Sequence, residues 1–458
     1  MFEAVSKLSA GARAWAVDFP ARFQRKVSQG AYRPEVDGLR FFAIAFVIFG
    51  HSLERAARFF ASYRDTLGGT ALEAHLQMAP LGVNLFFAIS GFILANQAIK
   101  ANTTPLSAGF LKVYFGRRVM RIEPPYIILL LATWALISVT GYVPDGTHRF
   151  DVAPASLNVS LIGSLFYLHD LIWGSFPRLF PPGWSLEVEV QFYVLAPLLF
   201  WLWTRLSRAE AQATLAAAFF AGGVALSILD PKTLGPVHVE YSLLHYFNFF
   251  WLGIALAYFR APLTDWIAPR SAGFATTLGW LGLALCVGLP TPQEQPAPQA
   301  LDEMLRLPLV YLGLTGVFVS TFAPRSGFRA FCSRPWISLV GGACYSIYLV
   351  HLQVTQVIAS IAAKAAPGAP LAAVAAIFVA SALVVVAVGL TYYVLVERRF
   401  MTRDWHLLVW AAIARALGRE AAPAPVDRRP RLAVSREVGS ETSTRRVAPN
   451  RAAGAGRG

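Results

Sequence analysis

An arginine and a histidine share the first long apolar stretch of the sequence. Arg40 and His51 lie eleven residues apart in the run YRPEVDGLRFFAIAFVIFGH, which ends at His51. At 100° per residue they face the same side of a helix, about 16 Å apart along its axis. An imidazole titrates near neutral pH and suits general-base work on a hydroxyl. The pair indicates an intramembrane catalytic site or, equally well, a snorkelling arginine and an interfacial histidine.

A second cluster is basic. Arg117, Arg118 and Arg121 lie in the run YFGRRVMRIEPPY, which starts at Tyr114. Arg118 and Arg121 are three residues apart and therefore share a helix face. Guanidinium groups bind phosphates through charge-assisted, often bidentate hydrogen bonds. The cluster fits a phosphate site at the cytoplasmic entrance of a membrane span, and it also fits a plain topology determinant.

Two glutamates follow a Pro-Pro-Gly turn in the run PPGWSLEVEVQFY. Glu187 and Glu189 are two residues apart, so they point about 200° apart on a helix. We expect only one of them to face a central cavity and the other to face head groups or a loop. The alternative is that both simply stabilise the first turn of a helix, where acidic residues are favourable.

Small and polar residues inside other apolar runs favour structural roles. Gly82 and Gly91 in the run GVNLFFAISGF permit close helix contact, and Ser90 between them can hydrogen-bond to another helix. His351 in the run CYSIYLVH is another histidine inside an apolar run. We interpret it as a structural histidine rather than a catalytic one.

The cysteines and histidines predict no metal site. The three cysteines do not form a CxxC pair, and the histidines are scattered along the chain: Cys286, Cys332, Cys344 and eight histidines. Buried small apolar side chains are the simplest interpretation of the cysteines.

The composition is that of a polytopic membrane protein with an all-α fold. Of 458 residues, 56% are hydrophobic and only 14% are charged, against about 25% charged in ordinary soluble domains. Charges are too few to cover a soluble surface, and apolar runs of membrane-spanning length recur. We predict about ten transmembrane helices, over 40–56, 80–98, 120–141, 187–204, 212–229, 242–259, 273–289, 305–322, 338–360 and 370–396.

The distribution of Lys and Arg predicts the orientation. With ten spans, the N-terminal segment and the loops on its side carry eighteen Lys and Arg, against seven on the opposite side. The positive-inside rule therefore places both termini in the cytoplasm. The stretch 157–172 is also apolar, but it contains His169 and Asp170. We predict that it is a re-entrant or interfacial segment rather than a span.

Three segments are expected along the chain. Residues 1–38 form a cytoplasmic N-terminal segment, either an interfacial helix or a loosely ordered leader, with no cleavable signal peptide. Residues 39–400 form the transmembrane domain. Residues 401–458, rich in Ala, Arg, Pro and Ser, form a largely disordered cytoplasmic tail.

The order of the motifs is more specific than any one of them. R-x10-H, GVxxFFxxSGF, RRxxRIxPxY, WSLxxE followed by QFY, and YSIYLxH occur in this order between Tyr32 and about Phe400. This combination resembles the membrane acyltransferase-3 family of O-antigen and exopolysaccharide O-acyltransferases. The resemblance covers nearly the whole membrane region.

The resemblance implies a function and a location. Members of this family transfer an acyl group, usually acetyl, from cytoplasmic acyl-CoA to a carbohydrate hydroxyl at or beyond the outer face of the bacterial inner membrane. The acyl-CoA is then a co-substrate rather than a bound cofactor, and no metal is implied. A carbohydrate or glycolipid acceptor and the bilayer are the expected partners, and nucleic acid is not.

The resemblance also assigns residues. By motif position, Arg40 and His51 match the family's essential Arg and His, with His51 as general base or transient acyl carrier. Arg118 and Arg121, flanked by Arg117, match its cytoplasmic RxxR pair and would bind CoA. Glu189 matches the first glutamate of the WSLxxEEQFY run, and we include it among the catalytic residues.

The sequence departs from the family pattern at two positions. Val190 replaces the second glutamate of the run, and Asn84 stands where GVDxFF has an aspartate. No hydrolase-like domain is expected after the last span, so a separate extracytoplasmic partner could accept the acyl group.

An alternative from another class is a secondary transporter of a glycan, lipid or organic anion. Ten spans with intramembrane charges would suit such a protein, but no two halves of the chain show matching broken helices.

Overall fold

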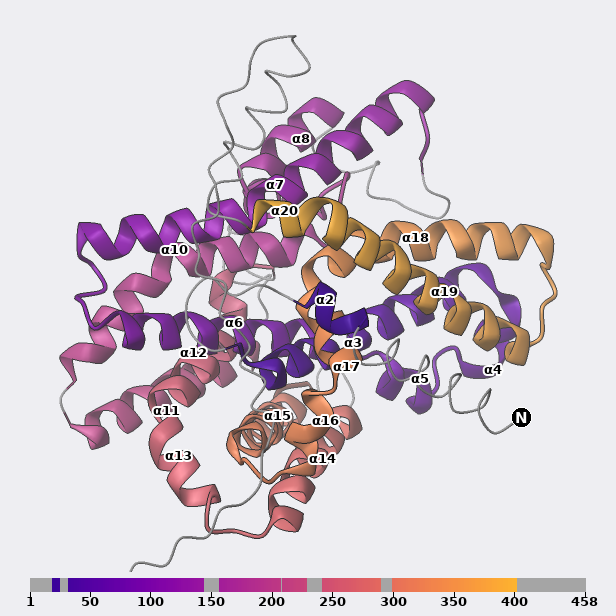
Figure 1. Cartoon of the computed structure of the whole chain (residues 1–458). Helices are drawn as coiled ribbons and strands as arrows, with labels where there is room; N and C mark the ends of the chain where they lie inside the picture. Colours follow the sequence, from indigo (N-terminus) through magenta and orange to yellow (C-terminus); the bar gives the residue numbers. More distant parts are fainter. Residues whose placement is uncertain are drawn as a thin grey trace, which may run out of the picture. The chain divides into compact units, whose positions relative to one another are not determined.

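The computed structural model is built from helices (Figure 1). No strand occurs among the residues that it describes, which are 19–24, 32–143, 156–206, 208–228, 241–289 and 299–401. The chain divides into two units, 1–403 and 404–458, and every described residue belongs to the first. Most of the predicted segment 1–38 and nearly all of the predicted tail 401–458 lie outside the described residues.

The all-α, multi-pass prediction is confirmed. By length and composition, eight apolar segments suffice to cross a membrane, and their main helices are α3 (Pro34–Phe59), α6 (Ala79–Ala101), α7 (Ala108–Thr140), α10 (Gly183–Arg205), α11 (Ala209–Ile228), α15 (Gln299–Phe322), α18 (Cys344–Ala365) and α19 (Leu371–Tyr392). Two further apolar helices are shorter, α12 (Leu243–Tyr258) and α14 (Ala272–Gly288). The predicted number of ten spans depends on counting these two.

Short helices connect or flank the long ones. They are α2 (Phe19–Phe23), α4 (Ala61–Leu67), α5 (Ala71–Leu76), α8 (Leu157–Leu165), α9 (His169–Trp173), α13 (Arg260–Ile267), α16 (Gly327–Cys332), α17 (Pro335–Gly342), a π-helical turn (Tyr393–Glu397) and α20 (Arg398–Phe400). The stretch 157–172 forms α8 and α9, of nine and five residues. At 1.5 Å per residue, neither can cross a bilayer core of about 30 Å.

The predicted span 338–360 was wrong as one helix. The structure breaks it at Ala343, between α17 and α18. Just before this break α17 packs tightly against α3: a methyl group at Gly341 would overlap the backbone oxygen of Asp37.

Helix α7 has clear capping signals at both ends. The Ser107 hydroxyl accepts a hydrogen bond from the backbone N–H of Phe110, and Gly141 closes the other end with φ of 63°. Between these caps the helix continues through Pro124 and Pro125. One helix therefore carries the arginine cluster into the long apolar segment that follows it.

Helix α6 contacts α3 and α12 through glycines, as the sequence predicts. A side chain at Gly82 would overlap the backbone of Ala43 on α3, and one at Gly91 would overlap the backbone of Phe250 on α12. Figure 1 shows α6 beside both helices. These contacts bring the three helix backbones as close as small residues allow.

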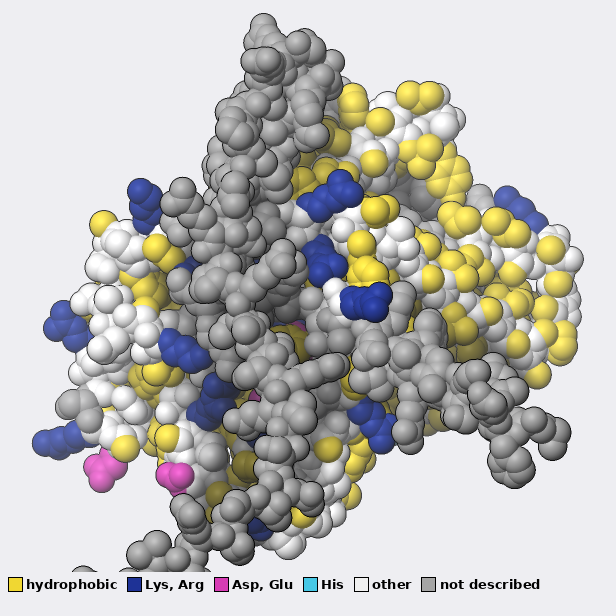
Figure 2. All heavy atoms as spheres, in the orientation of Figure 1, with side chains coloured by type: hydrophobic (Ala, Val, Ile, Leu, Met, Phe, Trp, Pro, Cys, Tyr) yellow, Lys and Arg dark blue, Asp and Glu magenta, His cyan; other side chains and the backbone are white. Residues whose placement is uncertain are grey.

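Apolar side chains are exposed on α18 and α19. Figure 2 shows hydrophobic side chains gathered over this part of the surface with few charged ones. Val357 and Ile361 on α18, and Val379 and Leu383 on α19, are exposed. A continuous apolar surface of this kind is expected where helices face lipid.

Candidate active site

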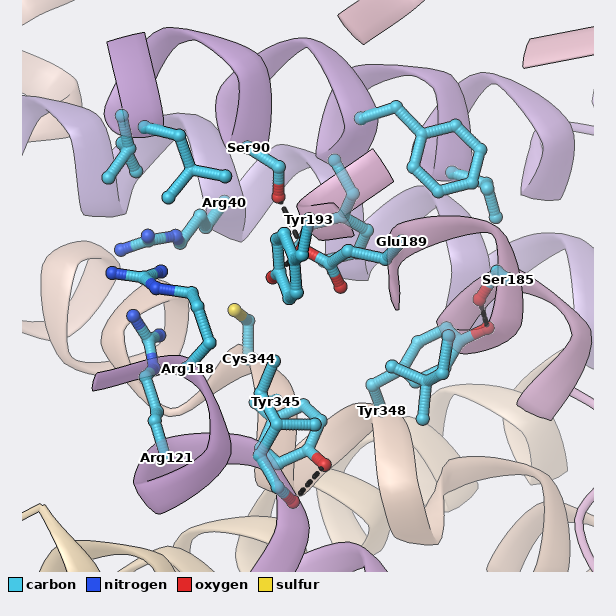
Figure 3. A pocket seen from close by; sticks show the side chains of 17 residues that line it. Arg40, Ser90, Arg118, Arg121, Ser185, Glu189, Tyr193, Cys344, Tyr345 and Tyr348 are labelled. Atoms are coloured by element: carbon cyan, nitrogen blue, oxygen red, sulfur yellow. Dashed lines mark hydrogen bonds between the residues drawn. The ribbon is translucent and has the colours of Figure 1, made fainter. Parts of the chain in front are cut away.

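A cavity lies inside the helical bundle, between α3, α6, α7, α10 and α18. It measures about 90 Å³, and its wall mixes apolar side chains with the polar ones labelled in Figure 3, which are Arg40, Ser90, Arg118, Arg121, Ser185, Glu189, Tyr193, Cys344, Tyr345 and Tyr348. Five motifs that are far apart in the sequence therefore contribute side chains to one cavity.

Three guanidinium groups gather at one end of the cavity. Figure 3 shows Arg40 from α3 beside Arg118 and Arg121 from α7. Arg40 is buried and forms an ion pair with Asp37, and Arg118 donates a hydrogen bond to Oε1 of Gln97 over 3.0 Å. One buried and two half-buried arginines with one carboxylate beside them leave an excess of positive charge at this end, as an anion site requires.

One donor of this cluster lacks a protein acceptor. The Nε of Arg118 is buried and has no hydrogen-bond partner in the described part of the chain. Leaving a buried donor unpaired costs about 1–3 kcal/mol, and more for a charged group. An anionic ligand in the cavity would supply the missing acceptor.

Glu189 lines the cavity between its two ends. Its Oε1 accepts hydrogen bonds from the hydroxyls of Ser90 on α6 and Tyr193 on α10. The Arg118 guanidinium lies 5.9 Å from the centre of the Tyr193 ring, on the same side of the cavity. Two hydroxyl donors therefore hold the carboxylate in one orientation.

Hydroxyl groups line the opposite end. The hydroxyls of Ser185 and Tyr348 are 2.6 Å apart, and the Tyr348 hydroxyl also donates to the backbone oxygen of Pro182 over 2.9 Å. Figure 3 shows this pair across the cavity from the arginines. The cavity is thus polar at both ends, with the Glu189 carboxylate between them.

His51 does not line this cavity. Its ring lies 5.1 Å from the ring of His351 on α18, and the His351 ring lies 5.2 Å from that of Tyr348. The three rings connect His51 to the hydroxyl end of the cavity. His351 is completely buried, and its Nε2 has no hydrogen-bond partner among the described residues.

Two further residues that the sequence analysis singled out, Arg117 and Glu187, do not line the cavity. Arg117 is exposed and does not line the cavity, although its neighbour Arg118 does. Glu187 is buried, and its carboxylate accepts hydrogen bonds from the backbone N–H groups of His169 and Asp170. Of the two glutamates, Glu189 faces the cavity and Glu187 holds the connection that contains α9.

The sequence analysis missed the residues at the hydroxyl end. Ser185 and Tyr348 lie inside the WSLxxE and YSIYLxH motifs but were not singled out, and His351 was interpreted as structural. Tyr348 and His351 are three residues apart and share a helix face, and this spacing could have identified these two residues as candidates. No group of three or more His, Cys, Asp or Glu side chains within the described ranges could hold a metal ion.

Comparison with known proteins supplies the family. Residues 33–393 match the family model described as "Acyltransferase domain" of the acyltransferase-3 type. The chain is 29% identical over 283 residues to the exopolysaccharide production protein ExoZ of Rhizobium meliloti, an alignment that covers 60% of this chain and 76% of that protein. No solved structure matches.

Two other curated relatives match over shorter shares of their length. Nodulation protein 10 of Rhizobium leguminosarum is 27% identical over 53% of this chain and 66% of its own length. The putative peptidoglycan O-acetyltransferase YrhL of Bacillus subtilis is 25% identical over 47% of this chain and 31% of its own length. The family match spans most of the described helices and every residue that lines the cavity. The chain therefore belongs to the acyltransferase-3 family of membrane proteins.

Proposed function

We propose that this protein is an inner-membrane O-acyltransferase. It moves an acyl group, acetyl in the simplest case, from cytoplasmic acyl-CoA to a hydroxyl of a cell-envelope or exported carbohydrate. The main support is one arrangement: Arg40, Arg118 and Arg121 gather at one end of a cavity whose other end leads through Tyr348 and His351 to His51. The names of the relatives ExoZ and YrhL agree with this substrate class.

The arginine end is the donor site in this proposal. The phosphates of CoA carry several negative charges, and planar guanidinium groups bind them bidentately. Arg118 has a buried donor to offer, and Arg121 lies one helical turn away. The pantetheine arm would extend along the cavity past Glu189, whose carboxylate can accept hydrogen bonds from its amide N–H groups.

His51 is the base in this proposal. It removes the proton of the acceptor hydroxyl, the hydroxyl oxygen forms a bond to the thioester carbonyl carbon, and the carbon–sulfur bond breaks. The CoA thiolate leaves and takes up the proton. A second route, in which His51 carries the acyl group for a time, gives the same products, an ester and free CoA.

The orientation follows from charge. The excess of Lys and Arg on the side of the N-terminal segment supports cytoplasmic termini and a cytoplasmic arginine cluster. The donor would therefore enter from the cytoplasm and the acceptor from the outer side. A separate extracytoplasmic partner could receive the acyl group before the final acceptor does.

Two measurements test the proposal together. Purified protein should bind radiolabelled acetyl-CoA, and envelope glycans from a strain that lacks the gene should lose O-acyl groups in mass analysis and regain them on complementation. Absence of acetyl-CoA binding together with unchanged glycans would overturn the proposal and favour the transporter alternative.

A further inference from the structure

Glu54 lies one helical turn after His51 on α3 and contacts its ring. The Oε2 of Glu54 is 2.9 Å from Nδ1 of His51. An ionised carboxylate can only accept a hydrogen bond, so Nδ1 of His51 carries the proton. The other ring nitrogen, Nε2, is then unprotonated and can act as a base. No motif of the family resemblance includes Glu54.

From this contact we infer that Glu54 is a positioning residue for His51. It fixes the tautomer and orientation of the ring, and its negative charge stabilises the imidazolium that forms when Nε2 takes the hydroxyl proton. The proton passes on to the leaving thiolate, and Glu54 stays ionised throughout. This inference rests on the proposed function, in which His51 is the base.

The surroundings explain why a carboxylate is needed there. Arg55 and Arg58 on α3 lie near the pair, with Nη1 of Arg55 3.8 Å from Glu54. On the opposing helix α18, the ring of His351 lies 5.1 Å from that of His51. Because these neighbours are cationic or neutral, protonation of His51 is unfavourable without the charge of Glu54.

The tautomer of His351 also supports a special role for the Glu54–His51 pair. Its Nδ1 faces the backbone oxygen of Tyr348 and so donates a hydrogen bond to it, which leaves Nε2 unprotonated. Two adjacent imidazoles thus each present an unprotonated nitrogen. His51 differs from its neighbour in having a carboxylate partner, and that partner makes it the ring that can hold a positive charge.

The test compares Glu54→Gln with Asp65→Asn in the full-length protein in lipid nanodiscs. Asp65 is an exposed acid on α4, the next helix along the chain, and its variant controls for loss of a negative charge. The probes are acetyl-CoA and envelope polysaccharide extracted from a strain that lacks the gene. We expect Glu54→Gln to lower kcat at least about tenfold with KM for acetyl-CoA unchanged, and Asp65→Asn to behave as wild type.

The pH profile separates positioning from simple structural damage. With a neutral Gln, protonated His51 loses its stabilising charge, so the acidic limb of kcat/KM moves to lower pH. Glu54→Asp keeps the charge but shortens the side chain, and should lose less rate with a smaller displacement of the limb. This variant also keeps the test open if Glu54→Gln does not accumulate in the membrane.

The experiments distinguish a failure of the inference about Glu54 from a failure of the proposed function. A Glu54→Gln protein with wild-type kcat and an unmoved acidic limb, beside an inactive His51→Ala protein, would overturn the positioning role and leave the proposed function standing. Wild-type protein that transfers no acetyl group to the polysaccharide and does not bind acetyl-CoA would instead overturn the proposed function itself.

Discussion

The rings of His51 and His351 lie in contact, with their centres 5.1 Å apart, although 300 positions separate the two residues in the sequence. One ring comes from α3 and the other from α18, and the second also contacts Tyr348 at the cavity wall. The contact gives the first helix of the domain a direct connection to the hydroxyl end of the cavity.

The role of His51 is tested by replacement. His51→Ala should reduce acyl transfer by about a hundredfold to ten-thousandfold, the usual cost of removing a general base. His51→Gln should fail as well, because an amide cannot accept the proton at neutral pH. Transfer rates are measured with protein that inserts and binds acetyl-CoA normally; near wild-type rates would remove His51 from the mechanism.

The arginine cluster should determine donor affinity. Replacing Arg118 and Arg121 together with Ala removes two charge-assisted contacts of about 1.5–3 kcal/mol each, so acetyl-CoA affinity should fall well over tenfold. Lys112→Ala, an exposed cation on the same helix, is the matched control. Equilibrium binding to detergent-solubilised protein measures the effect, and unchanged affinity would reduce the pair to topology determinants.

Arg117 and Arg118 are neighbours in the sequence, but they should differ in how much they contribute to acetyl-CoA binding. Arg117 is exposed outside the cavity, so Arg117→Ala should weaken acetyl-CoA binding less than Arg118→Ala does. A larger loss at Arg117 would mean that the donor binds along the outer side of α7 rather than in the cavity.

Arg40 should matter for stability as well as for binding. Arg40→Ala leaves Asp37 buried without its arginine, a change that costs about 3–5 kcal/mol for buried pairs. Arg40→Lys keeps the charge but loses the planar fork, so it should retain part of the activity. Thermal unfolding in detergent should show that Asp37→Asn restores stability to the Arg40→Ala protein; no recovery would argue against the ion pair.

The stability of the segment around α9 should depend on pH. Burial lowers the pKa of His169 to about 4, and the ring bonds to Ser160 and to the backbone oxygen of Ser175. The unfolded chain binds a proton with a pKa near 6.5, so stability falls as pH drops from about 6.5 towards 4. Proteolysis of the 157–182 segment should accelerate over this window, and His169→Gln should flatten the dependence.

The sequence predicted the helices better than it predicted where they stop. Apolar runs identify membrane-spanning helices because the bilayer requires about twenty apolar residues. The break at Ala343 was missed because apolar composition continues through it, and the close approach of Gly341 to Asp37 beside it joins residues far apart in the chain.

Some residues of the candidate site could be predicted from the sequence and others could not. Arg40, Arg118 and Arg121 could be identified as candidates because arginines in apolar surroundings are rare. Ser185 could not, because serines are common in helix contacts and only tertiary packing shows which of them line a cavity, and the spacing of Tyr348 and His351 alone does not distinguish a site from a structural contact. Glu54 was missed for a related reason, since a glutamate near the end of a predicted span is ordinarily a solvated residue.

The glycine contacts of α6 have a consequence for how the donor gets in. A cavity of about 90 Å³ is far smaller than the roughly 300–1,000 Å³ pockets that hold drug-sized ligands, so some wall must yield before a pantetheine arm fits. At Gly82 and Gly91 the backbone of α6 lies directly against those of α3 and α12, so these three helices pack closely. Of the helices that line the cavity, α7 has the smallest buried share, so opening the cavity there would disrupt the least buried surface and would displace Arg118 and Arg121.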